Sequence, residues 1–525
     1  MRWRQALLVV LLLLAAGLRL YRLDKYPLPM HQDELSNAYD AYSIVETGAD
    51  RNGATFPLVL RANGAVDYRP PLYTWLATVP IRILGFSPMA ARLPSAILGI
   101  ASLALLFGFA RRLVNEDFAF LAVAFGVFSP WHITYSRLAH EGAMLHGFFV
   151  ILILYFWQRT AERGYPHWQL GATGFAIGFS SSAYQTTRLI APLLLLLVAC
   201  DVFRFDPGRR RSLVVLVVAA FLGALPQLWV LVTQPEHFFA RLMATVPAAD
   251  SPSTLQSAVH GLSLVFGPKL LFWPNMQDTG YLAARLLFVE LPFYYLGFLV
   301  LPRLLPSTLG RFRWYVYVVF AVAIIPAIVT AHSASVRVSA ALLLLPIWTA
   351  AGVMWSAQLF ARYGVARKLT YAAVTAGAAA SIAFTAYMYF GSATVNGARS
   401  NNALVQVGQR LATLAPQYDR VFVVDSPWYA GLHVAAFSGM HPSEFQETRK
   451  ITVDAKGWDY ITAVGKYRFL KPRELLPIAR RACREKTRDL FVSRTAVDNA
   501  APFDSVSWHT EKYYFTESRA QSPCH

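Results

Sequence analysis

Two adjacent carboxylates, Asp33 and Glu34, lie in the stretch YPLPMHQDELSNAYDAYSIVETG, shortly after the first apolar run of the chain. A carboxylate in a partly dry site can take the proton from a hydroxyl or amine that attacks a substrate. The same pair also suits a helix start, with Asp33 as the N-cap of a helix over 34–47, Glu34 in its first turn and Gly48 at its end. The pair can therefore act as a general base, as a helix cap, or as both.

Arginines also stand where apolar runs end, in SPWHITYSRLAHEGAM (129–144), SSAYQTTRLIAP (181–192) and TAHSASVRVSAALLLLP (330–346). An arginine in a nonpolar setting is costly, so it generally has an anionic partner or lines a wet cavity. We expect one polar cavity whose candidate members are Asp33, Glu34, Asp67, Tyr68, Arg69, Arg137, His140, Glu141, Gln185, Arg188, His332 and Arg337. Several of these residues also have an ordinary alternative role. Arg69 can anchor a lipid headgroup, and Arg188 and Arg337 can snorkel to the interface. Glu141 can form an ion pair with Arg137, and His140 and His332 can simply lie at the interface.

The elements that must position these residues are membrane helices. The 525 residues are 55% hydrophobic and 15% charged, whereas soluble proteins carry about 25% charged residues. The chain contains repeated apolar runs of about 20 residues each, the length that a helix needs to cross the hydrocarbon core. We expect a polytopic α-helical membrane protein with eleven spans, at approximately 5–21, 91–110, 117–131, 142–158, 168–183, 188–203, 212–232, 284–302, 314–331, 338–358 and 369–390.

The net charge of +18 follows a topological pattern. Sixteen basic residues, from Arg2 to Lys368, lie at one set of span ends, and the positive-inside rule places those ends in the cytoplasm. The N-terminus is then cytoplasmic, and an odd number of spans leaves the chain after about Phe390 outside. We interpret the basic, apolar start as an uncleaved first span. The charge indicates topology, and no nucleic-acid partner is expected.

The predicted membrane domain, 1–391, contains two long outer loops. The first, 22–90, holds the acidic pair and the segment LATVPIRILG, which Pro80 and Arg82 make an interfacial helix instead of a span. The second, 233–281, mixes aromatic and basic residues and suits a segment at the headgroup level.

The tail, 392–525, changes composition and predicts an extracytoplasmic α/β domain. DRVFVVDSPW (419–428) and RDLFVSRT (488–495) have the pattern of strands, and KPRELLPIARRACREK (471–486) has helical spacing. Cys483 and Cys524 in this tail can form a disulfide or stay free.

An arginine-rich cavity on the outer side of a membrane suits a lipid-carried donor, because nucleotide-activated sugars and ATP are cytoplasmic. The planar guanidinium group binds the phosphate of such a donor through bidentate, charge-assisted hydrogen bonds. A carboxylate facing the phosphate suits deprotonation of a hydroxyl nucleophile. The acidic pair is thus expected to be a general base held where a lipid-linked donor arrives.

The order of these stretches resembles a known family. A basic first span is followed by DE, YRPPLYTWL, GFSPMAARLPSAILG, YSRLAHEGAML, AYQTTRLIAPLLLL and HSASVRVSAALLLLP, over about 1–359. This is similar to the bacterial GT-C glycosyltransferases of the protein O-mannosyltransferase and aminoarabinose transferase type, a group like glycosyltransferase family 39. The tail stretch DRVFVVDSPWYAGLHVAAFSGMHPSEFQ also looks like outer domains of some members.

The resemblance implies an inverting glycosyltransferase of the cell membrane. Its donor is a polyprenyl-phosphate sugar, and its acceptor is a lipid, polysaccharide or protein on the extracytoplasmic side. Asp33, with Glu34 beside it, matches the catalytic carboxylate, and Arg69 matches the basic residue before the prolines. Arg188 and Arg337 match positions near the donor phosphate. Such an enzyme also contacts membrane lipids.

Other positions bear on the family site as well. Glu141 matches an acidic position after the third span. The aminoarabinose type has an acidic residue directly before the basic one, where this chain has Tyr68, and Asp67 stands one position away. A family metal site on that carboxylate is therefore not assigned, and no other metal-ligand spacing occurs. No cofactor beyond the lipid-linked donor is predicted, and a divalent metal is left open.

Two other functions are compatible with intramembrane charges. A secondary transporter or lipid flippase also has them, commonly near the midplane of paired repeats. Here the charges gather on one face and no internal repeat is visible, which favours the enzyme. A catalytically inactive relative that serves as a scaffold is the third possibility.

Overall fold

The computed structural model describes residues 2–27, 30–245, 253–273, 285–304, 310–330, 335–391, 402–425, 427–475, 477–479, 481, 487–495, 502–508 and 511–517. The chain divides into two compact units. The membrane unit comprises Met1–Leu23, Pro70–Tyr73 and Arg92–Ser392. The loop–tail unit comprises Asp24–Arg69, Thr74–Ala91 and Ala393–His525, so it joins most of the first long loop to the tail. The domain boundary at residue 391 stays a prediction.

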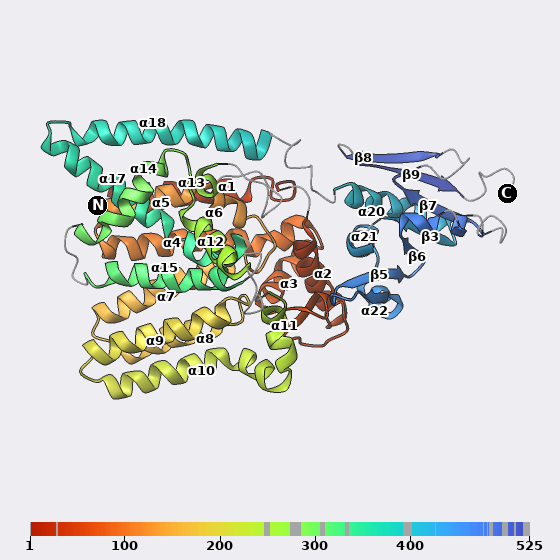
Figure 1. The fold of residues 1–525 in the computed structure, drawn as a ribbon, viewed down its shortest axis with the longest axis horizontal. Coiled ribbons are helices and arrows are strands. Elements are labelled where there is room, and N and C mark those ends of the chain that lie inside the picture. Colours follow the sequence, from red (N-terminus) through yellow and green to blue (C-terminus); the bar gives the residue numbers. More distant parts are fainter. Residues whose placement is uncertain are drawn as a thin grey trace. The chain divides into compact units, whose positions relative to one another are not determined.

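The membrane unit is built from helices, many of which lie side by side (Figure 1). They are α1 (Arg2–Leu20), α4 (Pro88–Leu113), α5 (Glu116–Phe128), α6 (Pro130–Tyr135), α7 (Leu145–Glu162), α8 (His167–Ser180), α9 (Thr187–Phe205), α10 (Arg209–Thr233), α11 (Pro235–Thr245), α12 (Ser253–Phe266), α13 (Pro268–Phe272), α14 (Glu290–Val300), α15 (Phe312–Val329), α16 (Ser339–Leu342), α17 (Leu345–Arg362) and α18 (Arg367–Ala386). Short turns of other helix types lie at Leu301–Arg303, Ser335–Arg337 and Tyr387–Gly391.

Six described segments are long and apolar enough to cross a membrane. They are Trp3–Leu20, Pro88–Leu113, Arg209–Thr233, Phe312–Val329, Ser339–Arg362 and Arg367–Gly391. The other five predicted spans contain α5, α7, α8, α9 and α14, which are shorter or more polar. This is the pattern of a multi-pass membrane protein, and the total of eleven spans stays a prediction.

Small residues let neighbouring membrane helices approach closely. A side chain at Gly178 of α8 would collide with the backbone of Ala220 in α10. A side chain at Gly223 of α10 would in turn collide with the carbonyl of Phe175. Packing of this kind drives helix association in lipid, where the hydrophobic effect contributes little. It fixes α8 against α10 at the end of α8 that leads into Gln185.

Helix α2 (Gln32–Thr47) of the loop–tail unit begins one residue before the acidic pair. The predicted N-cap at Asp33 is wrong, because His31 is the N-cap: its side chain accepts from the backbone N–H of Asp33, and the Glu34 side chain accepts from that of His31. The helix ends at Gly48, as expected, in a left-handed conformation with φ 76°.

The rest of the first loop forms a two-stranded antiparallel hairpin of β1 (Leu60–Gly64) and β2 (Asp67–Arg69), followed by helix α3 (Leu72–Leu84). Helix α3 covers the segment that was expected to be an interfacial helix.

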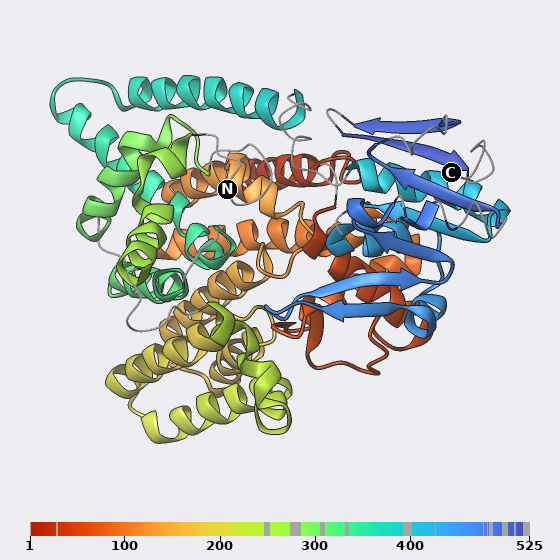
Figure 2. The ribbon, with the colours of Figure 1, turned by 45° about the vertical axis from the view of Figure 1, so that its right-hand side comes forward.

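The tail contains a β-sheet, drawn in blue in Figure 2. Its described strands number seven, in the order β4-β5-β6-β3-β7-β9-β8. They are β3 (Arg420–Val424), β4 (Lys450–Val453), β5 (Asp459–Val464), β6 (Tyr467–Leu470), β7 (Asp489–Ser493), β8 (Asp504–Trp508) and β9 (Glu511–Glu517). Strand β3 is parallel to β6 and β7, and the other pairs are antiparallel. Phe422 and Phe491 stack in the core between β3 and β7. The two predicted strands are thus the neighbouring strands β3 and β7.

Helices α20 (Asn402–Leu414), α21 (Pro427–Phe437) and α22 (Pro442–Thr448) complete the tail, with single turns at Ala415–Gln417 and Pro472–Glu474. The predicted helix over 471–486 begins with the second of these turns and is helical at its described residues after that. Cys483 and Cys524 lie outside the described residues.

Helix α2 packs against α21 and α22, which makes the first loop and the tail one unit. The rings of Tyr39 and Phe445 lie 5.2 Å apart between centroids. The Gln446 side chain donates to Thr47 Oγ1 at 3.0 Å and to the carbonyl of Asp50 at 2.8 Å. Apolar and polar contacts therefore both join these distant parts of the sequence.

Candidate functional site

Asp33 lies in the first turn of α2, and its side chain is 35% exposed. Asn63 of β1 donates its Nδ2 to Asp33 Oδ1 at 2.9 Å and to Asp67 Oδ2 at 3.2 Å. Two of the predicted acids are thus brought together by an amide that the sequence analysis did not name.

Glu34 lies beside Asp33 but has a different environment. It is buried, and its Oε2 accepts from the backbone N–H of His31 at 3.1 Å. His31 Nδ1 lies 3.5 Å from Asp33 Oδ2 but accepts from the backbone N–H of Asp33 at 3.3 Å. A ring nitrogen that accepts carries no proton, so this short approach is not an ion pair. Asp33 is the more exposed carboxylate of the two.

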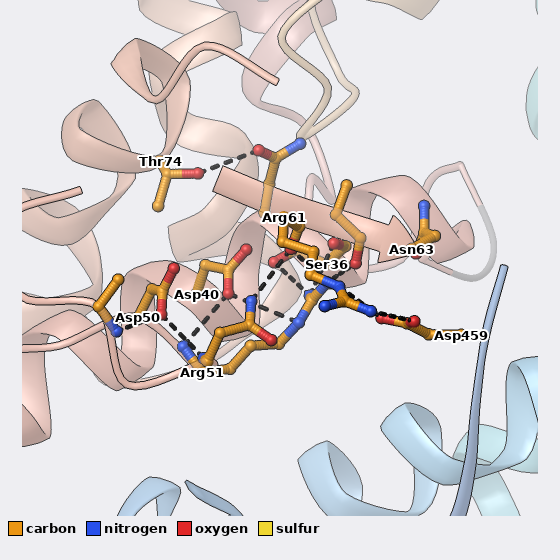
Figure 3. Close-up of polar contacts among 12 residues, drawn as sticks. Ser36, Asp40, Asp50, Arg51, Arg61, Asn63, Thr74 and Asp459 are labelled. Atoms are coloured by element: carbon orange, nitrogen blue, oxygen red, sulfur yellow. Dashed lines mark hydrogen bonds and ion pairs between the residues drawn. The ribbon is translucent and has the colours of Figure 1, made fainter. Parts of the chain in front are cut away.

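A buried ion cluster lies in the same unit as Asp33 and includes Asp40 and Arg51 (Figure 3). Asp40, which is fully buried, accepts from Arg69 Nη2 at 2.8 Å and lies 3.6 Å from Arg51 Nε. Arg51 also donates to Ser36 Oγ at 2.6 Å and to the carbonyl of Ala62. The guanidinium group predicted to bind donor phosphate at Arg69 is therefore buried and already engaged by a carboxylate.

Asp40 and Arg51 were missed by the sequence analysis, although Asp40 follows Asp33 by seven residues, two turns along one helix face. Asp50, which follows the end of α2, is also buried. Burial, and then the negative charge of Asp40, raise the pKa of Asp50 above its ordinary value, although Asp50 Oδ1 accepts from the backbone N–H groups of Asn52 and Ala54.

The membrane unit holds a separate cavity of about 260 Å³. Its lining includes Gln185, Arg188 and Arg337, three of the predicted site residues, and no acidic residue among those described. Arg188 donates to Gln227 Oε1 at 2.8 Å and to the carbonyl of Phe238 at 2.5 Å, and its guanidinium carbon lies 4.1 Å from the centre of the Phe238 ring. Arg337 donates to Thr330 Oγ1 at 2.6 Å.

Arg241 of α11 lines the same cavity and was missed by the sequence analysis. It lies in the stretch QPEHFFARLM of the second long loop, whose aromatic-basic mixture was its only signal. Burial, and to a smaller extent the like charge of Arg241, lower the pKa of Arg337. A bound anion would relieve this repulsion.

A mostly apolar cavity of about 450 Å³ adjoins the first and shares Arg188 and Phe238 with it. Helices α8, α9 and α10 line it, with side chains that include Ile177, Ala191, Leu195, Val217, Phe221 and Leu231. A cationic cavity beside an apolar one can bind a phosphate group that carries a hydrocarbon chain.

The remaining predicted residues do not line this pair of cavities. Arg137 is buried and donates to the carbonyls of Leu18 and Tyr21 at 2.8 and 2.6 Å, which caps the end of α1. Glu141 Oε2 lies 3.8 Å from His140 Nδ1, but this nitrogen accepts from the backbone N–H of Gly142. His332 lies outside the described residues.

The structure thus brings Asp33 and Asp67 together in the loop–tail unit, and Gln185, Arg188 and Arg337 together in the membrane unit. Among the described residues no three His, Cys, Asp or Glu side chains come together as metal ligands would.

Comparisons with known proteins bear on the fold of the chain. Residues 68–229 match the model of a family described as dolichyl-phosphate-mannose-protein mannosyltransferase. A search of curated protein sequences finds no match. The crystal structure of ArnT from Cupriavidus metallidurans in the apo state is similar with a TM-score of 0.60 and 14% identity, covering 98% of each chain. The same ArnT bound to undecaprenyl phosphate gives a TM-score of 0.58 at 14% identity, covering 98% of this chain and 97% of that one.

A more distant similarity is to the oligosaccharyltransferase AglB from Archaeoglobus fulgidus, with a TM-score of 0.46 and 12% identity over 83% of this chain and 63% of that one. The chain has the GT-C membrane fold of ArnT. The resemblance drawn from the order of short motifs is confirmed for the fold by ArnT, and for residues 68–229 by the mannosyltransferase family model.

Proposed function

We propose that this protein is an inverting glycosyltransferase that moves a sugar from a polyprenyl-phosphate donor to an acceptor. One observation carries the proposal: arginines gather in a cavity whose described lining residues include no acid, beside an apolar cavity, within a GT-C fold. The acceptor is a lipid, polysaccharide or protein with a hydroxyl or amine nucleophile.

Arg188, Arg337 and Arg241 are assigned to the donor phosphate. Each is a cation that lines the same cavity, and Arg188 lies at its junction with the apolar cavity. The polyprenyl chain would occupy the apolar cavity between α8, α9 and α10. ArnT, which has the same fold, was solved with undecaprenyl phosphate bound, and this supports a lipid of that class as the carrier.

Asp33 is assigned as the general base. The acceptor oxygen or nitrogen attacks the anomeric carbon, and its proton passes to the Asp33 carboxylate. The bond between the anomeric carbon and the phosphate oxygen breaks, and its electron pair leaves with the polyprenyl phosphate. Cationic side chains stabilise the charge that develops on this phosphate, so no strong general acid is needed. Glu34 is assigned to the start of α2, and Arg69 to the pair with Asp40.

The topology is proposed with the function. Eleven spans in the cell membrane leave the N-terminus in the cytoplasm and the tail outside, because the basic residues gather at one set of span ends. This arrangement exposes the first loop, with Asp33, to acceptors on the extracytoplasmic side.

The proposal is tested with the full chain in proteoliposomes and a panel of undecaprenyl-phosphate monosaccharides labelled in the sugar. Wild-type protein should release label from at least one lipid, to acceptor or to water. Asp33→Asn should lower the rate by about 10²–10⁴-fold, the usual contribution of general base catalysis, and should still bind undecaprenyl phosphate.

Other results contradict parts of the proposal. Turnover by Asp33→Asn at the wild-type rate would remove Asp33 from the mechanism. Movement of intact labelled lipid between leaflets, with no sugar released, would support the flippase instead. A chain that neither releases sugar nor moves lipid would be a scaffold.

A further inference from the structure

The hairpin that carries Asn63 is irregular at that residue. Its pairs are Leu60 with Arg69, Arg61 with Tyr68 and Gly64 with Asp67, so Ala62 and Asn63 form a bulge without partners in β2. A bulge redirects side chains and is a typical device near active sites. Here the bulge places the side-chain amide of Asn63 against both Asp33 and Asp67.

The amide orientation of Asn63 follows from its partners. Ionised carboxylates only accept, so Nδ2 must face Asp33 and Asp67. Oδ1 then faces Gln32, whose Nε2 lies 3.5 Å away. A hydrogen bond on Asp33 Oδ1 favours the ionised carboxylate and holds its plane.

A turn in the tail, residues 454–459, packs against the tip of this hairpin. The backbone N–H of Ala65 donates to the carbonyl of Gly457 at 2.8 Å, and a side chain at Gly64 would collide with the backbone of the turn. Arg61 makes a bidentate ion pair with Asp459, at 2.9 and 2.5 Å (Figure 3). The charge-assisted, bidentate pair fixes both position and direction.

The turn is itself held rigid. Asp454 Oδ1 accepts from the backbone N–H groups of Lys456 and Trp458 at 2.8 and 2.9 Å. Strand β5 begins with Asp459 and belongs to the central sheet of the tail. The position of the hairpin is therefore tied to the fold of the tail, about 400 residues away in sequence.

We infer that Asn63 is a positioning residue for the proposed base Asp33, and that the tail holds it in place through the Arg61–Asp459 pair. The inference rests on the proposed function and deepens it, because it gives the tail a role in positioning the proposed base. The tail and Asp33 belong to the same unit. Asn63 touches the carboxylate and not the reacting sugar, so it acts through Asp33.

The first experiment measures transfer by full-length Asn63→Ala, Asn63→Gln and Asp459→Ala proteins. Asn63→Ala should lower kcat by about 10–100-fold, as displacements of about 1 Å in a reacting group do, with the donor KM unchanged. The acidic limb of its pH–kcat profile should move to higher pH. Asp33 loses a hydrogen bond that favours its ionised form, and no amide N–H then offsets the repulsion between Asp33 and Asp67. Asn63→Gln keeps an amide and should recover part of the rate.

His31, whose Nδ1 lies 3.5 Å from Asp33 Oδ2, and the adjacent Glu34 are both unchanged in these variants. Asp504→Ala is the matched control, because it removes another tail ion pair, Arg410 with Asp504 at 2.5 Å, away from the hairpin. It should keep the wild-type rate and pH profile. Asp459→Ala should lower kcat, and reversing the pair with Arg61→Asp and Asp459→Arg should restore part of it.

The second experiment measures hydrogen exchange of the hairpin, which needs no activity. Asp459→Ala should speed exchange at residues 60–69, and Asp504→Ala should not. Unchanged exchange, or wild-type kcat and pH profiles in both Asn63→Ala and Asp459→Ala, would overturn the inference. If Asp33→Asn is inactive in that case, the proposed function stands and only the positioning role fails. If wild-type protein transfers no sugar, the exchange result still decides whether the tail holds the hairpin.

Discussion

The arginines around the two parts of the candidate site have different partners, although elsewhere in the membrane unit Arg311 pairs with Asp201. In the loop–tail unit, Arg69 is paired with Asp40 and Arg61 with Asp459. In the membrane unit, Arg188 donates to the side-chain oxygen of Gln227 and to the carbonyl of Phe238, both of which are neutral. The first kind of arginine is neutralised within the fold. The charge of the second kind is not neutralised by these two neutral partners, so it is available to an anion that enters the cavity.

The difference has an energetic meaning. A buried charge without a counter-ion is costly. A buried arginine with a purely structural role is therefore expected to have a carboxylate partner. A cation that lines a cavity stays partly hydrated and retains a positive potential there, which an anionic ligand can use. Arg61 and Arg69 are therefore expected to affect stability first, whereas Arg188 is expected to affect ligand binding first. Substitutions in the two units should separate these effects.

The largest effect is expected for Arg69→Met. It leaves the Asp40 carboxylate, which is fully buried, without its closest cation. Removing one partner of a buried pair generally costs about 3–5 kcal/mol, so the apparent melting temperature of the purified protein in detergent should fall sharply. Adding Asp40→Asn to this variant removes the uncompensated charge and should recover part of the loss.

Arg410→Met is the control for that experiment. Arg410 pairs with Asp504 in the tail, but its side chain is 45% exposed, and exposed pairs contribute at most about 1 kcal/mol. Equal shifts for Arg69→Met and Arg410→Met would contradict the structural role of Arg69 and return it to the list of donor-binding candidates.

The sequence was informative where a local signal existed. Apolar run length and motif order predicted the GT-C membrane fold, and alternation of residue types predicted β3 and β7. The end of α2 at Gly48 was predicted because a left-handed residue favours glycine. The start of α2 was not, because a histidine that caps a helix is not among the usual N-cap residues.

The site itself was only partly predictable, since it depends on contacts between distant residues. Gln185, Arg188 and Arg337 share a cavity, as expected from their places at the ends of apolar runs. The pairing of Arg69 with Asp40 required the fold of the hairpin against α2. Asn63 has no sequence signal, because a bulge places it and an ion pair to residue 459 holds that bulge.

A smaller effect, on binding instead of stability, is expected for Arg188→Met. A charge-assisted hydrogen bond contributes about 1.5–3 kcal/mol, so the affinity for undecaprenyl phosphate should fall by about tenfold or more. Thermophoresis with the purified protein measures this. Arg188→Lys keeps a point charge and loses the planar fork, and it should bind with intermediate affinity.

Arg209→Met is the matched control, because Arg209 also lies over an aromatic ring, that of Phe203, at 4.8 Å, and does not line either cavity. It should bind undecaprenyl phosphate as the wild type does. If Arg188→Met also binds like the wild type, the cavity is not the phosphate site. The comparison between the two units would then lose its functional half.

The smallest effect, and the most sensitive to the buried ion cluster, is expected for Asp50→Asn. Burial and the charge of Asp40 raise the pKa of Asp50, so the folded protein holds this proton more tightly than the unfolded chain. Ionised Asp50 therefore lowers stability at every pH above its folded pKa, and the penalty disappears as the pH falls below the ordinary carboxyl pKa of about 3.9. Asparagine keeps the Oδ1 acceptor for the backbone N–H groups of Asn52 and Ala54. At pH 7.5 the variant should melt at the same temperature as the wild type or slightly higher, and the difference should shrink toward pH 4. A variant that is less stable than the wild type at neutral pH would instead show that attraction between Asp50 and Arg51 outweighs burial.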